Sequence, residues 1–599
     1  MIYHCEDHTC NYWDEGEKLP ERCPQCGRKL LRANEADMTG DDWTALGNTL
    51  WYAEASDKKR MVDCFRKAAY LGSAWGVCNL GICMEQGNGV EADPVQAFWL
   101  YQQAVEMGSL NAVCCLGVCY EHGIGTAPDA KQAAELYCKA AEYGSPRGQM
   151  LLARAFHDGI GVEADAAEAV HWVRAAAYQR YGEGMHRLGV CYEYGDGVEQ
   201  NWEHAVHWFR EAAESGVSAA MTDLGYCYEK GCGVEQSWEQ AFSWYRRGAE
   251  CGDLRSMHNL GYCYEKGRGV EQSWEQAFSW YRRGAECGYP VSMSNLGLCY
   301  KRGYGVEQNW QEAVKWYEQG AQCGNLQSMN NLAYCYEYGE GVEQNEDRAL
   351  YWYRRGAEAG SDYCMYCLGW NYSNGEGVEQ NMTEAIRWYT AAAEGGNADA
   401  MHNLGWLYDH GEGVEQDMKK AICWYERAAE QNHPAAMNSL GECYAMGRGV
   451  PRDLETAMEW YRRAAELGEA MADYNMGWHL EQAGKLSEAY AHYRKAADGN
   501  DDSAWWALGR FYENGVVVAQ DGKEARRCYE TGEKLGSVKC KMRLARCKLL
   551  GIGGRREKKA GLDLCRQALE LAKESSEKED YGYEAEMNLL RRTIAENES

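Results

Sequence analysis

Apolar positions along this chain recur at the spacing of one helical face, and the whole pattern returns every 36 residues. In one block, Met257, Leu260 and Tyr264 are apolar and lie three or four residues apart, as on the buried side of an amphipathic helix. Gly267 follows, and glycine adopts the left-handed conformation that often ends a helix. The pattern therefore predicts a first helix that ends near Lys266.

A second helix in each block begins at a residue that can cap it. Eleven positions in 36-residue register hold Asp, Asn or Ser, whose side chains accept hydrogen bonds from the free amides of a first turn. Pro94 follows the first of them, where proline's missing amide costs nothing. The predicted caps are Asp93, Asp129, Asp165, Asn201, Ser237, Ser273, Asn309, Asn345, Asn381, Asp417 and Asp453. Each block thus predicts a pair of helices.

The second helix carries an alanine three residues before a tryptophan, as in Ala241 and Trp244, and the tryptophan is mostly followed by tyrosine. Small residues let helices approach, and large rings fill the space between successive units. The column comprises Trp208, Trp244, Trp280, Trp316, Trp352, Trp388, Trp424 and Trp460. An aromatic stripe at this spacing is typical of a core, so we expect the tryptophans to pack between units.

Two glycines separated by one residue recur eleven times between these helices, from Gly87 and Gly89 to Gly447 and Gly449. A long fixed period is typical of stacked supersecondary units, none of which can bury its apolar face alone. Because the glycine pairs lie between two helices and not after a strand, we interpret them as joints and not as phosphate-binding loops. The sequence predicts an all-α solenoid of about fifteen helix-turn-helix units.

These columns together resemble the Sel-one-like repeat, a relative of the tetratricopeptide repeat that is lengthened by a Gly-x-Gly-Val loop. The resemblance covers residues 41–572 and implies a right-handed superhelix with a scaffold or adaptor role in complex assembly. Near residues 470–500 the spacing shortens, and this unit is similar to a plain tetratricopeptide repeat. Residues 573–599 are charged and out of register, and we expect them to form a polar capping helix.

Composition restricts the partners. The net charge of −29 disfavours nucleic acid and anionic membranes, since both require a basic surface. The chain has no apolar run long enough to span a bilayer, and its first ten residues lack the character of a signal peptide. We therefore expect a cytoplasmic protein whose partner is another protein or a peptide. Glutamates that follow the glycine loops, such as Glu271, are interpreted as a solvated edge.

Most of the 28 cysteines fall within the repeats. One column of the first helix contains Cys83, Cys119, Cys191, Cys227, Cys263, Cys299, Cys335, Cys443 and Cys547, and other units place Ala155 or Leu407 there. Such replacements indicate a small buried position, and stacked units hold equivalent residues too far apart for a disulfide. Cysteine-rich relatives of the repeat bridge their helices at the positions of Ala249 and Met257, so that framework is absent. An isolated pair, Cys364 and Cys367, would need an exposed helix N-terminus to act in redox chemistry.

The N-terminal residues 1–33 form a separate head, with a pattern unlike the repeats. Cys5, Cys10, Cys23 and Cys26 have the spacing Cys-x4-Cys-x12-Cys-x2-Cys, and the second pair resembles the knuckle of a zinc ribbon. Four thiolates complete a closed tetrahedral shell, which supplies folding energy to a segment too short for a core. We expect one structural zinc ion. His8 or His4 in place of Cys10, and thiols without metal, are the alternatives.

Asparagine recurs two residues before the glycine of the first helix, at Asn79, Asn259, Asn295, Asn331, Asn403 and Asn475. Asparagine is mildly unfavourable within a helix, so its recurrence needs a reason. One hypothesis is that these amides bind the backbone of an extended peptide on the concave face. The alternative is a ladder of hydrogen bonds between neighbouring units.

No sequence motif for catalysis is present: there is no serine elbow, no His-Glu-x-x-His and no distinctive carboxylate pair. We therefore expect a non-enzymatic scaffold that binds protein or peptide along the concave face of the array. A second hypothesis makes the head the recognition module and the array a spacer. A third, implied only by the cysteine-rich relatives, is weak activity on penicillin-type ligands.

Overall fold

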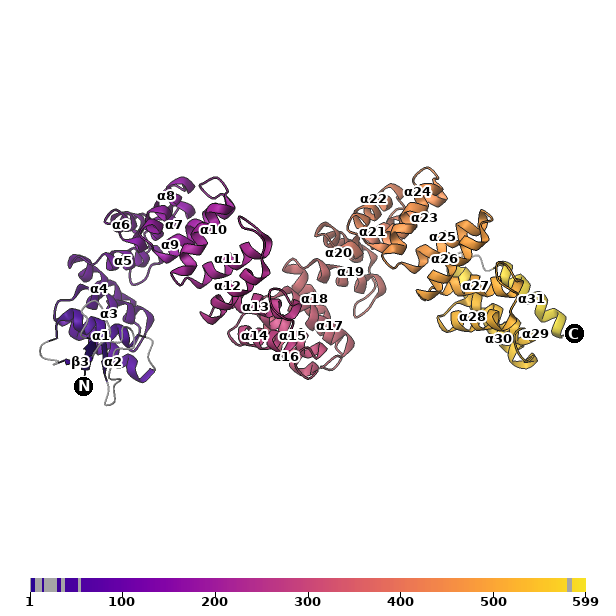
Figure 1. Cartoon of the computed structure of the whole chain (residues 1–599), viewed down its shortest axis with the longest axis horizontal. Helices are drawn as coiled ribbons and strands as arrows, with labels where there is room; N and C mark the ends of the chain where they lie inside the picture. The colour runs from indigo at the N-terminus through magenta and orange to yellow at the C-terminus, as the bar shows by residue number, and fades with distance from the viewer. Residues whose placement is uncertain are drawn as a thin grey trace. The chain divides into compact units, whose positions relative to one another are not determined.

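The structure is a computed structural model that describes residues 2–5, 13–15, 30–33, 38–51, 55–578 and 584–598. In this part of the chain, thirty-one helices follow three short strands, and consecutive helices stack in antiparallel pairs (Figure 1). The predicted all-α repeat solenoid is confirmed.

Odd-numbered helices are the first members of the pairs and even-numbered helices are the second. The first helices are α1 (Gly40–Thr49), α3 (Ala74–Gln86), α5 (Leu110–His122), α7 (Pro146–Asp158), α9 (Gly182–Tyr194), α11 (Ser218–Lys230), α13 (Leu254–Lys266), α15 (Pro290–Arg302), α17 (Leu326–Tyr338), α19 (Asp362–Asn374), α21 (Ala398–His410), α23 (Pro434–Met446), α25 (Ala470–Gln482), α27 (Asp502–Asn514) and α29 (Val538–Leu550). The second helices are α2 (Ala55–Tyr70), α4 (Pro94–Glu106), α6 (Ala130–Glu142), α8 (Ala166–Tyr178), α10 (Trp202–Glu214), α12 (Trp238–Glu250), α14 (Trp274–Glu286), α16 (Trp310–Gln322), α18 (Glu346–Glu358), α20 (Met382–Glu394), α22 (Met418–Glu430), α24 (Leu454–Glu466), α26 (Leu486–Asp498), α28 (Gly522–Lys534) and α30 (Lys558–Lys578). A final helix, α31, spans Glu584–Glu598.

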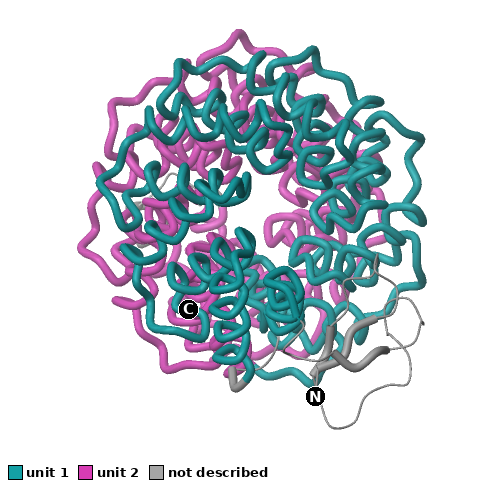
Figure 2. Tube along the Cα trace, turned by 90° about the vertical axis from the view of Figure 1, so that its left-hand side faces the viewer, with its two compact units in different colours: residues 1–309 teal, residues 310–599 magenta. Residues whose placement is uncertain are grey.

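The chain divides into two compact units, residues 1–309 and 310–599, which Figure 2 colours separately. The first holds the strands and helices α1 to α15, and the second holds α16 to α31. Within each unit, contacts that skip one helix join first helices to first helices, as between α5 and α7 or between α27 and α29. The first helices therefore lie on the inner side of the curvature of each unit.

The three strands are β1 (Ile2–Cys5), β2 (Trp13–Glu15) and β3 (Leu30–Ala33). They form an antiparallel sheet in the order β2-β1-β3. Of the four predicted zinc ligands, Cys10, Cys23 and Cys26 lie outside the described residues, and only the backbone of Cys5 is described. His4 belongs to the same strand as Cys5, and His8 also lies outside.

The predicted caps are confirmed at ten of the eleven positions, where the side-chain oxygen accepts a hydrogen bond from a first-turn amide. In α4, for example, the amide of Gln96 donates to Asp93 at 2.9 Å. The C-terminal end of a first helix can be held by a side chain as well. At the end of α11, the side chain of Gln236 donates to the backbone carbonyl of Glu229 at 2.8 Å. The loop between α11 and α12 is thus fixed at both of its ends, since Ser237 also caps α12.

Both glycines of each loop are required by geometry. Gly123 ends α5 in the left-handed conformation with φ of 71°. Gly125 has φ of 69°, and a Cβ built on it would lie 2.1 Å from the carbonyl oxygen of Pro94, in the second helix of the preceding pair. The loop backbone therefore packs directly on the neighbouring unit, which supports its interpretation as a joint.

The tryptophans are not the residues that form the buried core between the helices, although the sequence predicted this role for them. The tryptophan column is only half-buried, whereas the aromatic residue that follows it is fully buried in almost every unit. Arg247 lies over the ring of Trp244 at 4.2 Å, and Arg427 lies in the same way over Trp424 at 4.4 Å. The core column is Tyr101, Tyr137, Phe209, Tyr245, Tyr281, Tyr317, Tyr353, Tyr389, Tyr425, Tyr461, Tyr493 and Tyr529. The tryptophans cover this core from its edge, which corrects the sequence-based expectation.

The cysteine column behaves as predicted. All nine of its thiols are buried, and burial raises the pKa of Cys263 and Cys299 to about 12. The pair Cys364 and Cys367 lies near the start of α19, but burial also raises these pKa values, to about 11 and about 12. Thiolates are therefore disfavoured at both sites, which argues against redox chemistry of this pair.

The C-terminal part departs from the regular pattern in two places. Only three residues, 483–485, connect α25 to α26, as expected for the shortened unit. The last second helix, α30, continues to Lys578, beyond the boundary placed at residue 572. Helix α31 then packs on α29 through a buried side that includes Met587 and Leu590, so the capping helix is amphipathic and not wholly polar.

Candidate binding face of the first helices

Each first helix buries one side and exposes another. In α13, Met257, Leu260 and Cys263 are buried, whereas Arg255 and Lys266 are exposed. We call the positions equivalent to Arg255, Asn259, Tyr262 and Lys266 the first-helix face. In each unit it lies on the inner side of the curvature, because first helices there approach one another most closely.

The asparagine column belongs to this face, and several of its members bond to a neighbouring pair. The amide of Asn79 donates to Asn48 at 2.8 Å, and that of Asn475 donates to Asn438 at 3.0 Å. Asn295 lies 3.5 Å from the imidazole nitrogen of His258. These bonds are of the kind that the ladder interpretation requires.

The remaining members are less uniform. Asn403 hydrogen-bonds the tyrosines Tyr366 and Tyr389 of the preceding pair. Asn331 accepts a bond of 3.5 Å from Gln327 of its own helix, and Asn259 is half-buried. The structure thus shows amides that are largely engaged within the array, while binding of a peptide by this column stays a hypothesis.

The ladder extends through units that lack asparagine. In these units the residue at the asparagine position bonds to a side chain of the preceding pair, which lies one position before the asparagine position of that pair. Asp223 bonds in this way to His186 at 2.7 Å, and Ser439 to His402 at 3.4 Å. Burial lowers the pKa of both His258 and His402 to about 4, so each is neutral near pH 7 and bonds without charge. This partner column was not predicted, because its residue type changes from unit to unit.

An aromatic column also follows the first-helix face, and sequence reasoning missed it. It occupies the position between the glycine and the cysteine of each block. In the first unit it includes Tyr226 and Tyr262, with Leu298 next. In the second it comprises Tyr334, Trp370, Trp406 and Trp478, whereas the other first helices have Glu442, Arg510 and Arg546 there. Trp370, Trp406 and Trp478 are 44%, 37% and 38% exposed. The sequence does contain a signal for this column, because aromatic residues recur at a position that helical periodicity places outside the core.

In the described part of the chain, no group of three or more His, Cys, Asp or Glu side chains could hold a metal ion. The zinc site predicted at Cys5, Cys10, Cys23 and Cys26 falls in the head, outside the side chains that are described, and stays a prediction. Among the described helices, none is both long and apolar enough to cross a membrane.

Comparison with known proteins identifies the repeat. The family model described as Sel1 repeat matches at 76–109, 112–145, 146–181, 182–217, 218–253, 254–289, 290–325, 326–361, 362–397, 398–433, 434–469, 470–501, 504–537 and 538–573. The chain belongs to the Sel1 repeat family. This confirms the resemblance seen in the sequence.

Two solved Sel1-type structures are similar to the chain. A protective antigen of uropathogenic Escherichia coli strains that displays an SLR fold is 32% identical; the match covers 75% of this chain and 97% of that one, with a TM-score of 0.52. A Sel1 repeat protein from Oxalobacter formigenes is 31% identical over 41% of this chain and 96% of its own, with a TM-score of 0.38. No match to a curated protein was found.

Proposed function

We propose that this Sel1 repeat protein is a non-enzymatic scaffold whose first-helix face binds an extended segment of a partner protein. The observation that carries the proposal is the aromatic column of the second unit, which places exposed tryptophans on α19, α21 and α25 and the half-buried Tyr334 on α17. Large rings held on rigid helices provide contact area at a low cost in conformational entropy, and they are common among the residues that dominate interfaces.

The spacing of the column suits an extended chain. Neighbouring packed helices lie about 10 Å apart, and an extended peptide advances about 3.4 Å per residue. A partner segment that follows the column would therefore advance roughly three residues from one helix to the next. With a net charge of −29 on the scaffold, a segment with basic residues between its apolar ones is favoured.

The test is partner capture with matched variants in the second unit. Trp370→Ala combined with Trp406→Ala removes two exposed rings of the column. Tyr351→Ala removes a ring from α18 that is 51% exposed and lies on the second helices. In crosslinking and pull-down from the native cell, the amount of partner captured by the double variant should fall at least about tenfold. A tenfold loss of affinity corresponds to about 1.4 kcal/mol. Tyr351→Ala should capture it normally.

Retention of the partner by the double variant would contradict the proposal, provided that its melting temperature matches that of the unaltered protein. Deleting residues 1–33 tests the second hypothesis, in which the head recognises the partner. Loss of the partner upon that deletion, with capture by the double variant unchanged, would transfer recognition from the repeats to the head.

The same assay distinguishes binding of a peptide by the asparagine column from a ladder of hydrogen bonds between units. Asn295→Ala and Asn331→Ala would weaken capture if these amides bind the partner's backbone. Lowered melting temperature with unchanged capture would instead assign the column to the ladder between units, as the bonds of Asn79 and Asn475 favour.

A further inference from the structure

The buried tyrosine of each regular pair has a well-defined surrounding. The ring of Tyr281 lies against the position of Gly261, where a Cβ would come within 2.7 Å of it. Its hydroxyl donates to Glu265 at 2.8 Å. The ring centroid of His258 is 5.6 Å away, and Asn295 and Cys299 of the next first helix complete the enclosure.

Among the described pairs of the first unit, one has no aromatic ring at this position. Three blocks before Tyr281, the equivalent residue is Val173, which is 3% exposed. A cavity of about 440 Å³ lies beside it, between α7 and α9, with α8 as its floor. The five positions that enclose Tyr281 all line this cavity. Here they are Met150, Ala153, His157, Arg187 and Cys191. The cavity is therefore the space that a tyrosine ring fills in the regular pairs.

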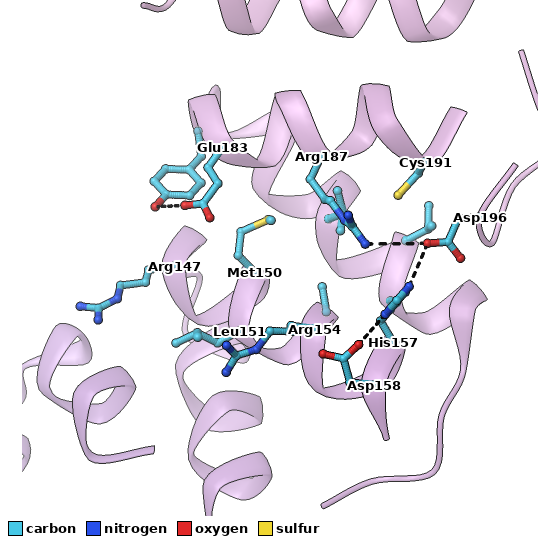
Figure 3. Close-up of a pocket in the computed structure, with 15 residues that line it drawn as sticks. Arg147, Met150, Leu151, Arg154, His157, Asp158, Glu183, Arg187, Cys191 and Asp196 are labelled. Carbon is cyan, nitrogen blue, oxygen red and sulfur yellow. Dashed lines mark hydrogen bonds and ion pairs between the residues drawn. The ribbon is translucent and has the colours of Figure 1, made fainter. Parts of the chain in front are cut away.

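The polar partner of the missing hydroxyl has changed as well. His157 occupies the position that is glutamate in the pair of Tyr281. Its imidazole nitrogens lie 2.6 Å from the Asp158 carboxylate and 3.3 Å from that of Asp196 (Figure 3). Both nitrogens of His157 are thus engaged, and the carboxylates of Asp158 and Asp196, which can accept further hydrogen bonds, are the groups that can meet a ligand hydroxyl.

The depth of the cavity is apolar and its rim is charged. Val170 and Val173 are buried, whereas the side chains of Arg154 and Arg187 are each 42% exposed at the opening. Arg154 pairs with Glu121, and Arg187 lies 3.9 Å from Asp196, a distance that leaves its guanidinium able to take a further acceptor. In Figure 3 the guanidinium of Arg187 points towards Asp196, which also contacts His157.

We propose that this cavity is a binding pocket for a phenol ring, either in a free hydroxyaryl acid or in a tyrosine side chain of a bound protein. The ring occupies the place of the absent tyrosine, against Val170, Val173 and Met150. The hydroxyl of the ligand donates to the carboxylate of Asp158 or Asp196, and an acid group of the ligand bonds the rim arginines. The volume lies within the range of small-molecule sites. The site is independent of the aromatic column proposed above, which was argued from the second unit.

The decisive variant restores the regular pair. Ala153→Gly with Val173→Tyr refills the cavity with the ring that the other pairs contain, and the glycine provides the close approach that such a ring needs. The matched control is Phe209→Tyr, which adds a hydroxyl to the next second helix, outside the lining of the cavity. A second variant, Arg154→Gln with Arg187→Gln, changes only exposed rim residues.

The probes are 3-(4-hydroxyphenyl)propionate, N-acetyltyrosine amide and, as a non-aromatic comparison, 3-cyclohexylpropionate, measured by ligand-observed NMR on the full chain. The unaltered protein should bind the hydroxyphenyl acid at least about tenfold more tightly than the cyclohexyl acid. The refilled variant should lose this binding while its melting temperature is unchanged or higher, and Phe209→Tyr should bind normally. If the refilled variant fails to fold, the rim variant provides the test. It should bind the hydroxyphenyl acid about tenfold more weakly than the unaltered protein does, and it should bind N-acetyltyrosine amide with unchanged affinity.

The two sources give different results. A pocket for a free acid should prefer the hydroxyphenyl acid to the uncharged amide, whereas a pocket for a partner's tyrosine should bind both, and the refilled variant should capture less partner from cells. No binding of either phenol to the unaltered protein, equal binding of the cyclohexyl acid, or undiminished binding to a folded refilled variant would overturn the proposal. Trp370→Ala with Trp406→Ala leaves the pocket intact, so failure of the scaffold proposal is recognised separately.

Discussion

The hydroxyl of Tyr281 donates a 2.8 Å hydrogen bond to the carboxylate of Glu265, and this bond joins the two helices of one pair. The same bond recurs between Tyr101 and Glu85, Tyr137 and Glu121, Tyr245 and Glu229, Tyr353 and Glu337, Tyr493 and Glu481, and Tyr529 and Glu513. Burial raises the pKa of Tyr281, so the phenol stays protonated and remains a donor. A polar bond between the two helices thus accompanies the packing of these seven pairs.

Tyr281→Phe should destabilise the protein by about 1 kcal/mol, because it removes the donor and leaves the half-buried Glu265 without this bond. Since repeat arrays open locally, hydrogen exchange in α13 and α14 is the appropriate measurement, together with the melting temperature. Tyr226→Phe, at a tyrosine that is 42% exposed, is the control. Equal effects of the two substitutions would show that the buried bond contributes nothing particular.

Phe209→Tyr should have the opposite effect. Phe209 holds the tyrosine position beside Glu193, and burial is the main cause that raises the pKa of Glu193. A carboxyl group whose pKa is higher in the folded state makes stability fall as pH rises through that pKa. The new hydroxyl should stabilise the carboxylate by about 1 kcal/mol and reduce this fall. Denaturation midpoints at pH 4.5 and pH 7 measure both effects; a lower midpoint at pH 7 would contradict the expectation.

The fold was predictable because many independent columns agree in each block. Gly123 with its positive φ, the cap Asp93 and the buried Cys263 all lie where the sequence places them. Confusion of Trp244 with Tyr245 arose because both are large and adjacent. A step of 100° around the helix decides which ring faces the neighbouring pair, and the residue types alone do not reveal that angle.

The candidate sites were less predictable for two physical reasons. The aromatic column mixes Tyr334 and Trp370 with Glu442, and exposed positions tolerate such change, so the column lacks the uniformity of a core position. The cavity at Val173 is defined by a missing ring, and a smaller apolar residue at one core position does not show whether its neighbours close the gap. Only the positions of the neighbouring helices in the structure show that the gap beside Val173 stays open.

The buried cysteine column should resist alkylation. Burial raises the pKa of Cys263 and Cys299 to about 12, and the thiolate is the reactive form. Cys251, Cys287, Cys323 and Cys423 are exposed. Brief treatment of the native protein with iodoacetamide, followed by peptide mass spectrometry, should label these four first. Labelling of Cys263 at a comparable rate before unfolding would contradict the structure of the core.

The head should carry one zinc ion per chain, since Cys5, Cys10, Cys23 and Cys26 can provide four thiolates. Metal analysis of the purified protein should find it, and Cys23→Ser with Cys26→Ser should remove it. Cys251→Ser, in the repeats, should not. Zinc retained by Cys10→Ser but lost in His8→Asn would assign the fourth ligand to the histidine. A metal-free unaltered protein would refute the zinc prediction.

Acid should weaken the ladder between units at His258 and His402. Burial lowers both pKa values to about 4, although nearby Glu265 and Asp399 act weakly in the opposite direction on His258 and His402 respectively. A histidine whose folded pKa is depressed contributes stability that is full above its unfolded pKa, near 6.5, and is lost as pH falls towards 4. The loss at pH 5 should be about 2 kcal/mol for each histidine, measured as the change in denaturation midpoint from pH 7.

Asparagine is the informative replacement at these two positions, because Asn438 holds the same place in its own unit and accepts from Asn475 at 3.0 Å. His258→Asn with His402→Asn should therefore keep the ladder while removing the titrating groups, so its midpoint should change less than that of the unaltered protein between pH 7 and pH 5. His122→Asn, at a side chain that is 55% exposed, serves as the control and should leave the acid sensitivity unchanged. An identical acid response in the double variant would show that other groups, and not these buried imidazoles, govern the stability of the array below pH 6.5.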